Sequence, residues 1–257
     1  MAKPSESGGV NAVGRAFTIL ELMANAEGDV GLSELATASG LPLPTIHRLV
    51  RTLVLQGYVR QLPSRRYGLG PGLIRLGESA SRQLGAWARP QLATLVERIG
   101  ETANMAMLDG DMVVYVAQVP SRHSMRMFTE VGRRVFVHCT GVGKAVLAQL
   151  PDATVREIVR RVGMPAQTDH SITDPDALVA ELDRIRERGW AEDDGEQEVG
   201  VHCFAVPVPG TPVPTAISVS GPAERVTRDA GERIIPVLLQ AAGDLAADLL
   251  QPTGQAG

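Results

Sequence analysis

The sequence lacks the features that several protein classes require. Only two of its 257 residues are cysteine, Cys139 and Cys203, too few for a disulfide framework. Aromatic residues make up 4% of the chain, which argues against stacking platforms for single-stranded nucleic acids. No apolar run approaches the roughly 20 residues of a membrane span, and residues 1–10 contain no apolar core of a signal peptide. We therefore expect a protein that works in a reducing, cytoplasmic setting.

The charge of the chain is weakly negative and unevenly spread. The full sequence has 25 Lys or Arg and 29 Asp or Glu, a formal net charge of −4. Residues 1–78 hold eight basic and six acidic residues, so this segment is slightly positive and the remainder is acidic. Such a distribution fits a small module that faces an anion, attached to a larger acidic module, and chance variation would also produce it.

The first 70 residues predict three helices and a hairpin. An apolar stripe of helical period indicates the first helix, formed by Val13, Ala16, Phe17, Leu20 and Met23. A short second helix follows, with Ser33 as its N-terminal cap and Gly40 as its stop. A third helix opens after Pro42, and "YVRQLPSRRYGL" alternates on both sides of Pro63-Ser64, as two paired strands do. This order is that of a winged helix-turn-helix.

The third helix has one apolar face and one basic face. Ile46, Leu49, Val50 and Leu53 share the face that would pack inward, which leaves the basic residues for solvent or a DNA duplex. Arginine can bind guanine in the major groove or hold phosphate, and arginines in a hairpin can lie along phosphates. The candidate DNA-binding residues are Ser33, Pro44, Thr45, His47, Arg48, Arg51, Arg65 and Arg66. A solvated helical face is the alternative, and the sequence does not decide which arginine reads bases.

The rest of the chain mixes helices and strands without βαβ alternation, which favours an α+β fold. A helix over residues 71–88, interrupted by Pro90, would connect two domains. Met112 to Val119 is a nearly continuous apolar run and predicts a buried central strand. Further strands are expected over 124–128, 201–208 and 215–220, and further helices over 143–149, 153–162, 175–188 and 228–250.

Several stretches, in this order, resemble the IclR family of bacterial transcriptional regulators. They are "GRAFTILELM", "LSELATASGLPLPTIHRLVRTLVLQGYV", "YGLGPGLIRLG", "GETANMAML", "VGRRVFVHCTGVGKAVLA", "RIRERGWAEDDGEQEVGVHCFAVPV" and "AISVSGP". The resemblance covers nearly the whole chain, and "SMRMFTEVG" and "LPLPTIHRL" look most like the allantoin- and glyoxylate-responsive members. One departure is Phe136-Val137, where relatives often have Pro-Leu, and it puts the fine shape of the pocket in doubt.

The resemblance implies four segments and an α+β architecture. They are a disordered tail over 1–9, a winged helix-turn-helix DNA-binding domain over 10–70, a linker helix over 71–89 and a GAF-like effector-binding domain over 90–257. It also implies a homodimer or homotetramer on double-stranded operator DNA, controlled by a small organic acid such as glyoxylate or an allantoin-pathway metabolite. The implied protein is a regulator of a catabolic operon, expected here to be a repressor.

The effector residues follow from the resemblance, and their spacing supports part of it. The candidates are Gly141, Val142, Asp193, Cys203, Ser218, Ser220 and Met127. Ser218 and Ser220 are two apart on a predicted strand, so their hydroxyls share one face. A Gly-rich turn with only a backbone role, a buried structural Cys203 and a solvated Asp193 are the alternatives.

No catalytic residues, metal ligands or cofactors are predicted. Neither His138-Cys139 nor His202-Cys203 can form a Cys–His dyad on a regular strand, because adjacent side chains point to opposite faces. The sequence has no CxxC or HExxH metal motif, no Walker loop and no GxGxxG. The competing hypothesis is an enzyme or small-molecule-binding protein on the GAF-like half, with an N-terminal module that contacts another protein.

Overall fold

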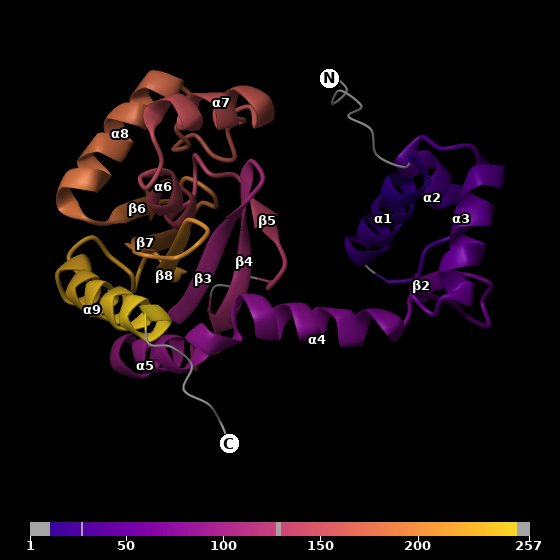
Figure 1. Ribbon diagram of the computed structural model, residues 1–257, viewed down its shortest axis with the longest axis horizontal. Helices are drawn as coiled ribbons and strands as arrows, with labels where there is room; N and C mark the ends of the chain where they lie inside the picture. Colours follow the sequence, from indigo (N-terminus) through magenta and orange to yellow (C-terminus); the bar gives the residue numbers. More distant parts are fainter. Residues whose placement is uncertain (1–10, 27, 127–129, 251–257) are drawn as a thin grey trace. The chain divides into compact units, whose positions relative to one another are not determined.

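The computed structural model describes residues 11–26, 28–126 and 130–250, which form two compact units, residues 1–80 and 81–257. The predicted disordered tail lies outside the described residues. Figure 1 shows the order of the elements along the chain, and each unit is treated separately below. No helix in the described ranges is long and apolar enough to span a membrane.

The N-terminal unit is a winged helix-turn-helix, as predicted. Helices α1 (Asn11–Ala24), α2 (Leu32–Ser39) and α3 (Leu43–Leu55) are followed by the antiparallel strands β1 (Val59–Gln61) and β2 (Tyr67–Leu69). Gly40 ends α2 in the left-handed conformation, with φ of 68°, as a glycine there can without steric cost. Val30 and Tyr67 form a further backbone bridge that ties the hairpin to the loop before α2.

Two local predictions for this unit are wrong. Gly31, not Ser33, occupies the N-cap of α2, where Glu34 accepts a hydrogen bond from the Gly31 amide at 3.0 Å. In α1, Val13 and Phe17 are 54% and 60% exposed, while the fully buried residue is Ile19. Apolar residues make up more than half of this helix, so periodicity alone does not identify which of them face the core. It wrongly assigned Val13 and Phe17 to the buried side.

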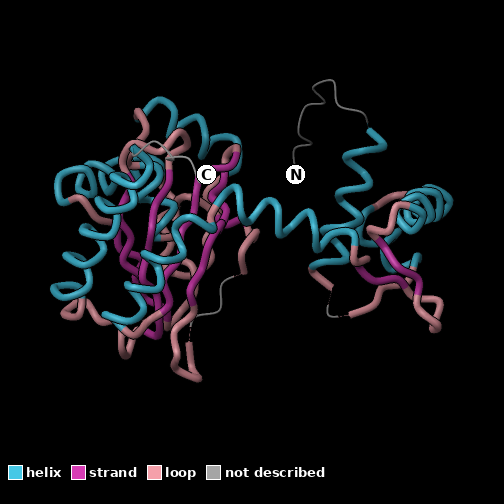
Figure 2. The backbone as a smooth tube through the Cα atoms, turned by 60° about the horizontal axis from the view of Figure 1, so that its bottom comes forward, coloured by secondary structure: helices cyan, strands magenta, loops and turns pink. Residues whose placement is uncertain are grey.

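The larger unit has an α+β architecture that matches a GAF-like domain. Its six-stranded sheet has the order β5-β4-β3-β8-β7-β6, and every neighbouring pair is antiparallel. The strands lie side by side in Figure 2. They are β3 (Thr102–Asp109), β4 (Met112–Val119), β5 (Arg134–Val135), β6 (Ala191–Asp194), β7 (Val201–Val208) and β8 (Thr215–Pro222).

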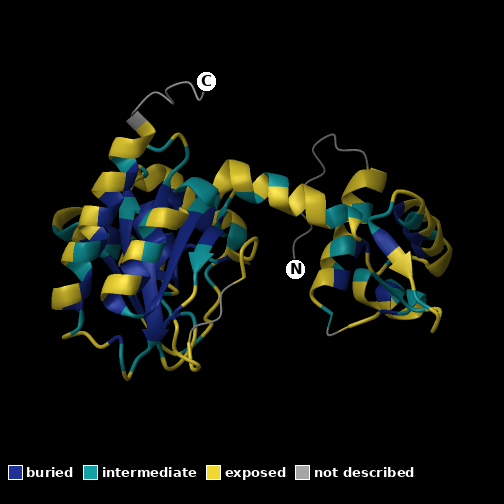
Figure 3. Ribbon diagram, turned by 90° about the horizontal axis from the view of Figure 1, so that it is seen from below, coloured by how far each residue is buried: buried dark blue, intermediate teal, exposed yellow. Residues whose placement is uncertain are grey.

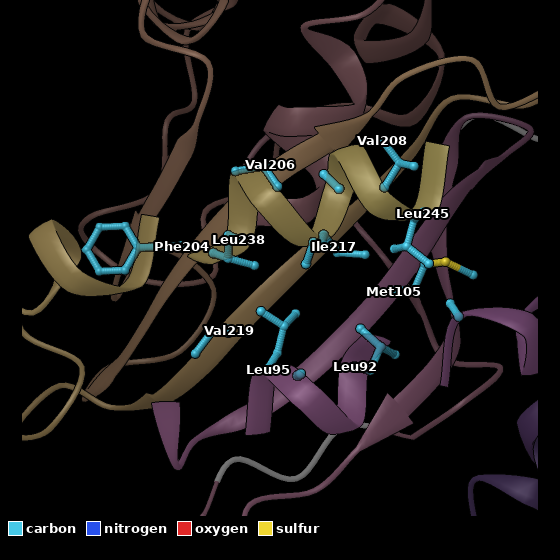
Figure 4. Close-up of a cluster of buried hydrophobic side chains, with 14 of the residues drawn as sticks. Leu92, Leu95, Met105, Phe204, Val206, Val208, Ile217, Val219, Leu238 and Leu245 are labelled. Atoms are coloured by element: carbon cyan, nitrogen blue, oxygen red, sulfur yellow. The ribbon is translucent and has the colours of Figure 1, made fainter. Parts of the chain in front are cut away.

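Helices cover both faces of the sheet and create two apolar layers. Helices α5 (Arg89–Ile99) and α9 (Gly231–Leu250) pack on one face, and α6 (Gly141–Leu147), α7 (Asp152–Val162) and α8 (Pro175–Arg188) lie on the other. Figure 4 shows the first layer, in which Leu92 and Leu95 of α5 and Leu238 and Leu245 of α9 meet the sheet. Figure 3 shows the sheet as the most buried part of this unit.

The connecting helix is shorter than predicted. Helix α4 (Gly72–Leu84) ends at Gly85, a 3-10 turn η1 (Ala86–Ala88) follows, and Pro90 lies in the first turn of α5 instead of breaking a helix. A Cβ on Gly85 would lie 2.2 Å from the Val116 carbonyl oxygen, so the chain turns where only glycine fits. No residue of α4 is buried.

Two strand predictions are also corrected. Residues 124 and 125 form a bend, residue 126 has no regular structure, and residues 127–128 lie outside the described residues. The apolar run Met112–Val119 does form β4, but it is not central. It pairs on one side with the two-residue strand β5 alone, and of its residues Val113, Val116 and Ala117 are buried while the others are half-buried.

Candidate functional site

The outer face of α3 presents basic side chains to solvent. The helix buries Ile46, Val50 and Leu53 against the rest of its unit. Pro44, His47, Arg48 and Arg51 are exposed, and Thr45 is half-buried. Neither Arg48 nor Arg51 forms an ion pair with any residue that the structure describes. The face is therefore free to bind an external anion, and one amphipathic helix provides both the packing surface and this free surface.

A groove beside this face brings in residues that the sequence patterns did not indicate. It has a volume of about 420 Å³ and is lined by α1 residues Asn11 and Arg15 together with Thr45, Arg48 and Thr52 of α3. The sequence pattern does not single out Arg15, because it lies within an apolar helical stretch. Its position beside Arg48 adds a second positive charge to the same side of the unit.

The two predicted hairpin arginines have different environments. Arg66 is held within the unit, because its guanidinium donates to both carboxylate oxygens of Glu34, at 2.9 and 2.8 Å, and to the Asp29 carbonyl. The side-chain hydrogen bond from Arg66 lowers the pKa of the Glu34 carboxyl. Arg65 is exposed and has a φ of 62°, unusual for a residue with a side chain. Arg65 is thus available to a ligand, whereas Arg66 fixes the hairpin to α2.

Three predicted effector residues form one row across the sheet of the larger unit. Asp193 on β6 is directly opposite Cys203 on β7, and Cys203 is directly opposite Ser220 on β8. Residues in direct register share a face, so all three point toward the layer that contains α6. Ser218 lies two residues along β8 on the same face, and its hydroxyl is buried without a hydrogen-bond partner among the described residues. The structure therefore brings these four candidates together.

The first residues of α6 lie against this row. A Cβ on Gly141 would be 3.0 Å from the Cys203 sulfur and 3.4 Å from Ala205, which explains a glycine at this position. Thr140 caps the helix by accepting from the Gly143 amide at 3.1 Å. The Gly141 and Val142 amides, by contrast, donate to no residue in the described ranges. The predicted backbone donors are thus available beside Cys203.

Buried charges surround the acidic end of the row. Burial raises the pKa of Asp193 to about 6, although its carboxylate accepts a 2.7 Å hydrogen bond from the Glu196 amide. The Glu196 side chain forms an ion pair with Lys144, whose own side chain is 2% exposed. Burial raises the pKa of Glu196, and Lys144 opposes that rise. The sequence did not predict this pair, since a lysine and a glutamate usually lie at the surface.

Neither adjacent Cys–His pair acts as a dyad. His138 Nε2 lies 3.2 Å from the Pro165 carbonyl oxygen, and the Cys139 thiol donates to Gln197. Burial raises the pKa of Cys139 to about 12, which leaves the thiol unreactive. His202 is bound to Glu192 at 2.9 Å. No group of three or more potential metal-ligating side chains is found among the residues that the structure describes.

Two further polar residues lie on the sheet face of the effector candidates. Met127 lies outside the described residues. The sheet face that carries Ser218 and Ser220 also carries Asn104 on β3 and Gln118 on β4, which the sequence analysis did not single out. The available signal was polarity: these are amide side chains in strands that are otherwise apolar.

Two family models match the chain. Residues 12–63 match the IclR helix-turn-helix domain, and residues 79–247 match the model for the bacterial transcriptional regulator IclR C-terminal domain. The chain is 36% identical over 253 residues to the transcriptional repressor IclR of Escherichia coli (strain K12), an alignment that covers 95% of this chain and 92% of that protein.

Solved structures show the same architecture. The crystal structure of an IclR transcriptional regulator from Alicyclobacillus acidocaldarius matches with a TM-score of 0.82 and 31% identity, and covers 93% of this chain and 98% of that chain. An IclR homolog from Microbacterium hydrocarbonoxydans, complexed with 4-hydroxybenzoate, matches with a TM-score of 0.79 and 25% identity, and covers 93% and 99% of the two chains.

Proposed function

The chain belongs to the IclR family of bacterial transcriptional regulators, and from that premise we propose that it represses a catabolic operon and leaves its operator when a small carboxylate binds. The observation that carries the DNA-binding half is the exposed, unpaired basic face of α3, opposite a buried apolar face. The proposed DNA contacts are Ser33, Pro44, Thr45, His47, Arg48, Arg51, Arg65 and Arg66. Arg66 would act mainly by holding the hairpin in place.

Operator binding by variants tests this interface. Arg48→Ala should weaken operator affinity about tenfold or more, as expected when an arginine contact to a base or phosphate is lost. Arg228→Ala is the matched control, because Arg228 is also exposed but lies in the larger unit and pairs with Glu192 at 3.2 Å. Equal losses for the two variants in a fluorescence-anisotropy titration would contradict the assignment.

Salt dependence separates the regulator from its rival. A protein that neutralises several phosphates releases counterions, so its affinity for duplex DNA should fall steeply between low and moderate salt. A small-molecule-binding protein or enzyme with a protein-contact N-terminal module would show no such slope. If two recognition helices occupy successive major grooves, the half-site centres should lie about 34 Å apart. A footprint with a single unpaired half-site would argue against that arrangement.

For the effector we propose a small organic acid held on the inner sheet face, the face that carries Ser218 and Ser220 and is covered by α6. The proposed contacts are the Gly141 and Val142 amides and the side chains of Asp193, Cys203, Ser218, Ser220 and Met127. Free amides and hydroxyls suit carboxylate oxygens, and the unsatisfied Ser218 hydroxyl supports a ligand at this face. An IclR homolog was crystallised with 4-hydroxybenzoate, which is also an organic acid. This is consistent with an organic acid as the ligand here.

Asp193 would oppose an anionic ligand if it stayed ionised. Its raised pKa of about 6 reduces that conflict, because a nearby carboxylate ligand would raise it further and favour the neutral acid. The neutral carboxyl could then donate to the ligand. Affinity for the acid should therefore increase as the pH falls from 8 toward 6.

The effector proposal names glyoxylate and the allantoin-pathway metabolites allantoate and allantoin as ligands to test first. A gel-shift series with each compound should show release of operator DNA by at least one of them. If none changes operator affinity, this choice of effector is wrong, and a thermal-shift screen of small organic acids would be the way to another. A ligand at about 100 times its dissociation constant stabilises its protein by about 2.7 kcal/mol.

We further propose that the chain works as a homodimer or homotetramer. Exposed apolar residues lie on α1, at Val13 and Phe17, and on α4, at Ile74 and Leu76. A second copy covering these residues would bury apolar area that now faces water. In this proposal the linker helix transmits the effector signal by changing the spacing of two recognition helices. Sedimentation of the whole chain as a monomer at micromolar concentration would exclude the arrangement.

A further inference from the structure

A chain of three polar side chains crosses the inner face of the sheet. Gln118 on β4 donates through Nε2 to Oδ1 of Asn104 on β3 at 3.0 Å. Asn104 in turn donates through Nδ2 to the hydroxyl oxygen of Ser220 on β8 at 3.1 Å. Asn104 and Ser220 are 1% and 4% exposed, so this chain is largely shielded from water.

We propose that Gln118 and Asn104 fix the direction of the Ser220 hydroxyl, so that its proton is free to bond a ligand acceptor next to the carboxylate and the site can hold 2-oxo acids, which only accept there, as well as 2-hydroxy acids. The inference rests on the proposed function in one respect: the effector must bind on the face that carries Ser220. It adds two residues that do not touch the ligand and act by positioning Ser220.

The proton of the Ser220 hydroxyl has no acceptor among the described residues. A hydroxyl has one proton to donate and two lone pairs that accept. Asn104 already donates to Ser220, and no residue in the described ranges accepts the Ser220 proton. That proton is therefore available to an acceptor atom of a bound ligand. The neighbouring Ser218 hydroxyl also lacks a hydrogen-bond partner within the described ranges, and the Cys203 thiol, a weak acceptor, lies close to it.

Gln118 controls the direction of the Ser220 O–H bond although it does not touch Ser220. An amide side chain has an accepting end and a donating end, so the direction of each hydrogen bond in the chain fixes the next one. If Gln118 offered an acceptor instead of a donor, Asn104 would have to turn its NH₂ group toward it. The Asn104 oxygen would then face Ser220 and take up its proton. Strand β3 separates Gln118 from Ser220, about 10 Å across the sheet.

The experiment reverses the direction of these hydrogen bonds by changing Gln118, the residue farthest from Ser220. In Gln118→Glu, the carboxylate at pH 8 can only accept, which forces the reversed direction. Isothermal titration of the full-length protein with pyruvate and with L-lactate gives a ratio of affinities for a matched 2-oxo and 2-hydroxy acid. Both ligands are monoanions of nearly equal size, so the added negative charge weakens both alike and cancels in the ratio.

We expect the ratio of pyruvate affinity to lactate affinity to fall about tenfold in Gln118→Glu, because lactate can still donate its hydroxyl proton to Ser220 and pyruvate has none to donate. Gln118→Met is the matched control: it removes the hydrogen bond but forces no reversal, and should keep most of the wild-type ratio. In a Ser220→Ala background, Gln118→Glu should leave the ratio unchanged. Asn104→Asp provides a second reversal if Gln118→Glu fails to fold.

Three results would overturn the inference. The first is a wild-type protein that binds acids while Gln118→Glu and Gln118→Met have the same ratio, which would leave the proposed function intact. The second is a change in ratio that persists without Ser220, which would mean that the effect does not pass through that hydroxyl. The third is a wild-type protein that binds neither acid, nor any acid of the effector series, and it would overturn the proposed function as well.

Discussion

Replacing Lys144 should destabilise the larger unit far more than breaking an ion pair at its surface. The Lys144 and Glu196 side chains are 2% and 11% exposed and are paired with each other. Lys144→Met keeps the apolar volume of the side chain but leaves a buried carboxylate without its partner. Such a loss costs about 3–5 kcal/mol. For a unit of this size, the melting temperature should fall by about 10 °C.

The controls isolate the buried charge as the cause. Arg156→Met breaks the pair between Arg156 and Asp176, whose side chains are 49% and 82% exposed, and should cost less than about 1 kcal/mol. The double variant Lys144→Met/Glu196→Gln removes both charges and should recover much of the lost stability. Calorimetry of the full chain measures all three. A loss in Lys144→Met as small as in Arg156→Met would refute the reasoning.

The same reasoning predicts a pH dependence with a definite sign. Burial raises the pKa of Glu196 above its unfolded value, so its ionisation reduces stability as the pH rises from the unfolded pKa to the folded one. Lys144 limits that penalty in the wild-type protein. The cost of Lys144→Met should therefore be largest above neutral pH and smallest below about pH 4, where the carboxyl is protonated in both states.

Three further predictions concern other parts of the chain. Burial raises the pKa of Asp193 to about 6, so ionising it reduces the stability of the wild-type protein as the pH rises from about 4 to 6. Asp193→Asn should consequently gain up to about 3 kcal/mol relative to wild type between pH 4 and pH 8 in urea unfolding, and a pH-independent difference would contradict this. In Gly143→Ala the new Cβ would lie 2.4 Å from the Val137 carbonyl oxygen, so we expect a loss of about 1–3 kcal/mol and weaker effector binding. Gly243→Ala, a site with no atom within 4 Å, should be neutral or stabilising in the same thermal melts. Arg65→Gly relieves a left-handed backbone at φ 62° and should leave stability equal or higher by up to about 1 kcal/mol, yet weaken operator binding in anisotropy titrations; unchanged binding would show that the Arg65 side chain makes no contact with DNA.

The elements that follow from local signals were predicted from the sequence. Helix α3 and the hairpin depend on periodicity and turn residues close together in the chain. Helix α8 and strand β7 match their predicted bounds, because capping residues and apolar runs mark both ends. The α+β class followed from the order of such segments.

The errors arise where tertiary pairing decides the structure. Strand β6 has the sequence Ala-Glu-Asp-Asp, with no strand propensity, and forms only because it pairs with β7. The same pairing buries Asp193 beside Cys203. Lys144 and Asn104 were overlooked for a related reason: nothing local shows that a polar side chain is buried. Their partners are 52 and 116 residues away in the chain.

Helix α4 carries a consequence for how such a regulator would respond. An isolated helix of 13 residues is marginally stable in water, and α4 gains little from burial, since none of its residues is fully buried. Its helical content should therefore rise with protein concentration and fall on dilution. The helix α4 would be fully formed only when another surface shields Ile74 and Leu76. Self-association would therefore determine whether α4 can transmit effector binding to the DNA-binding unit.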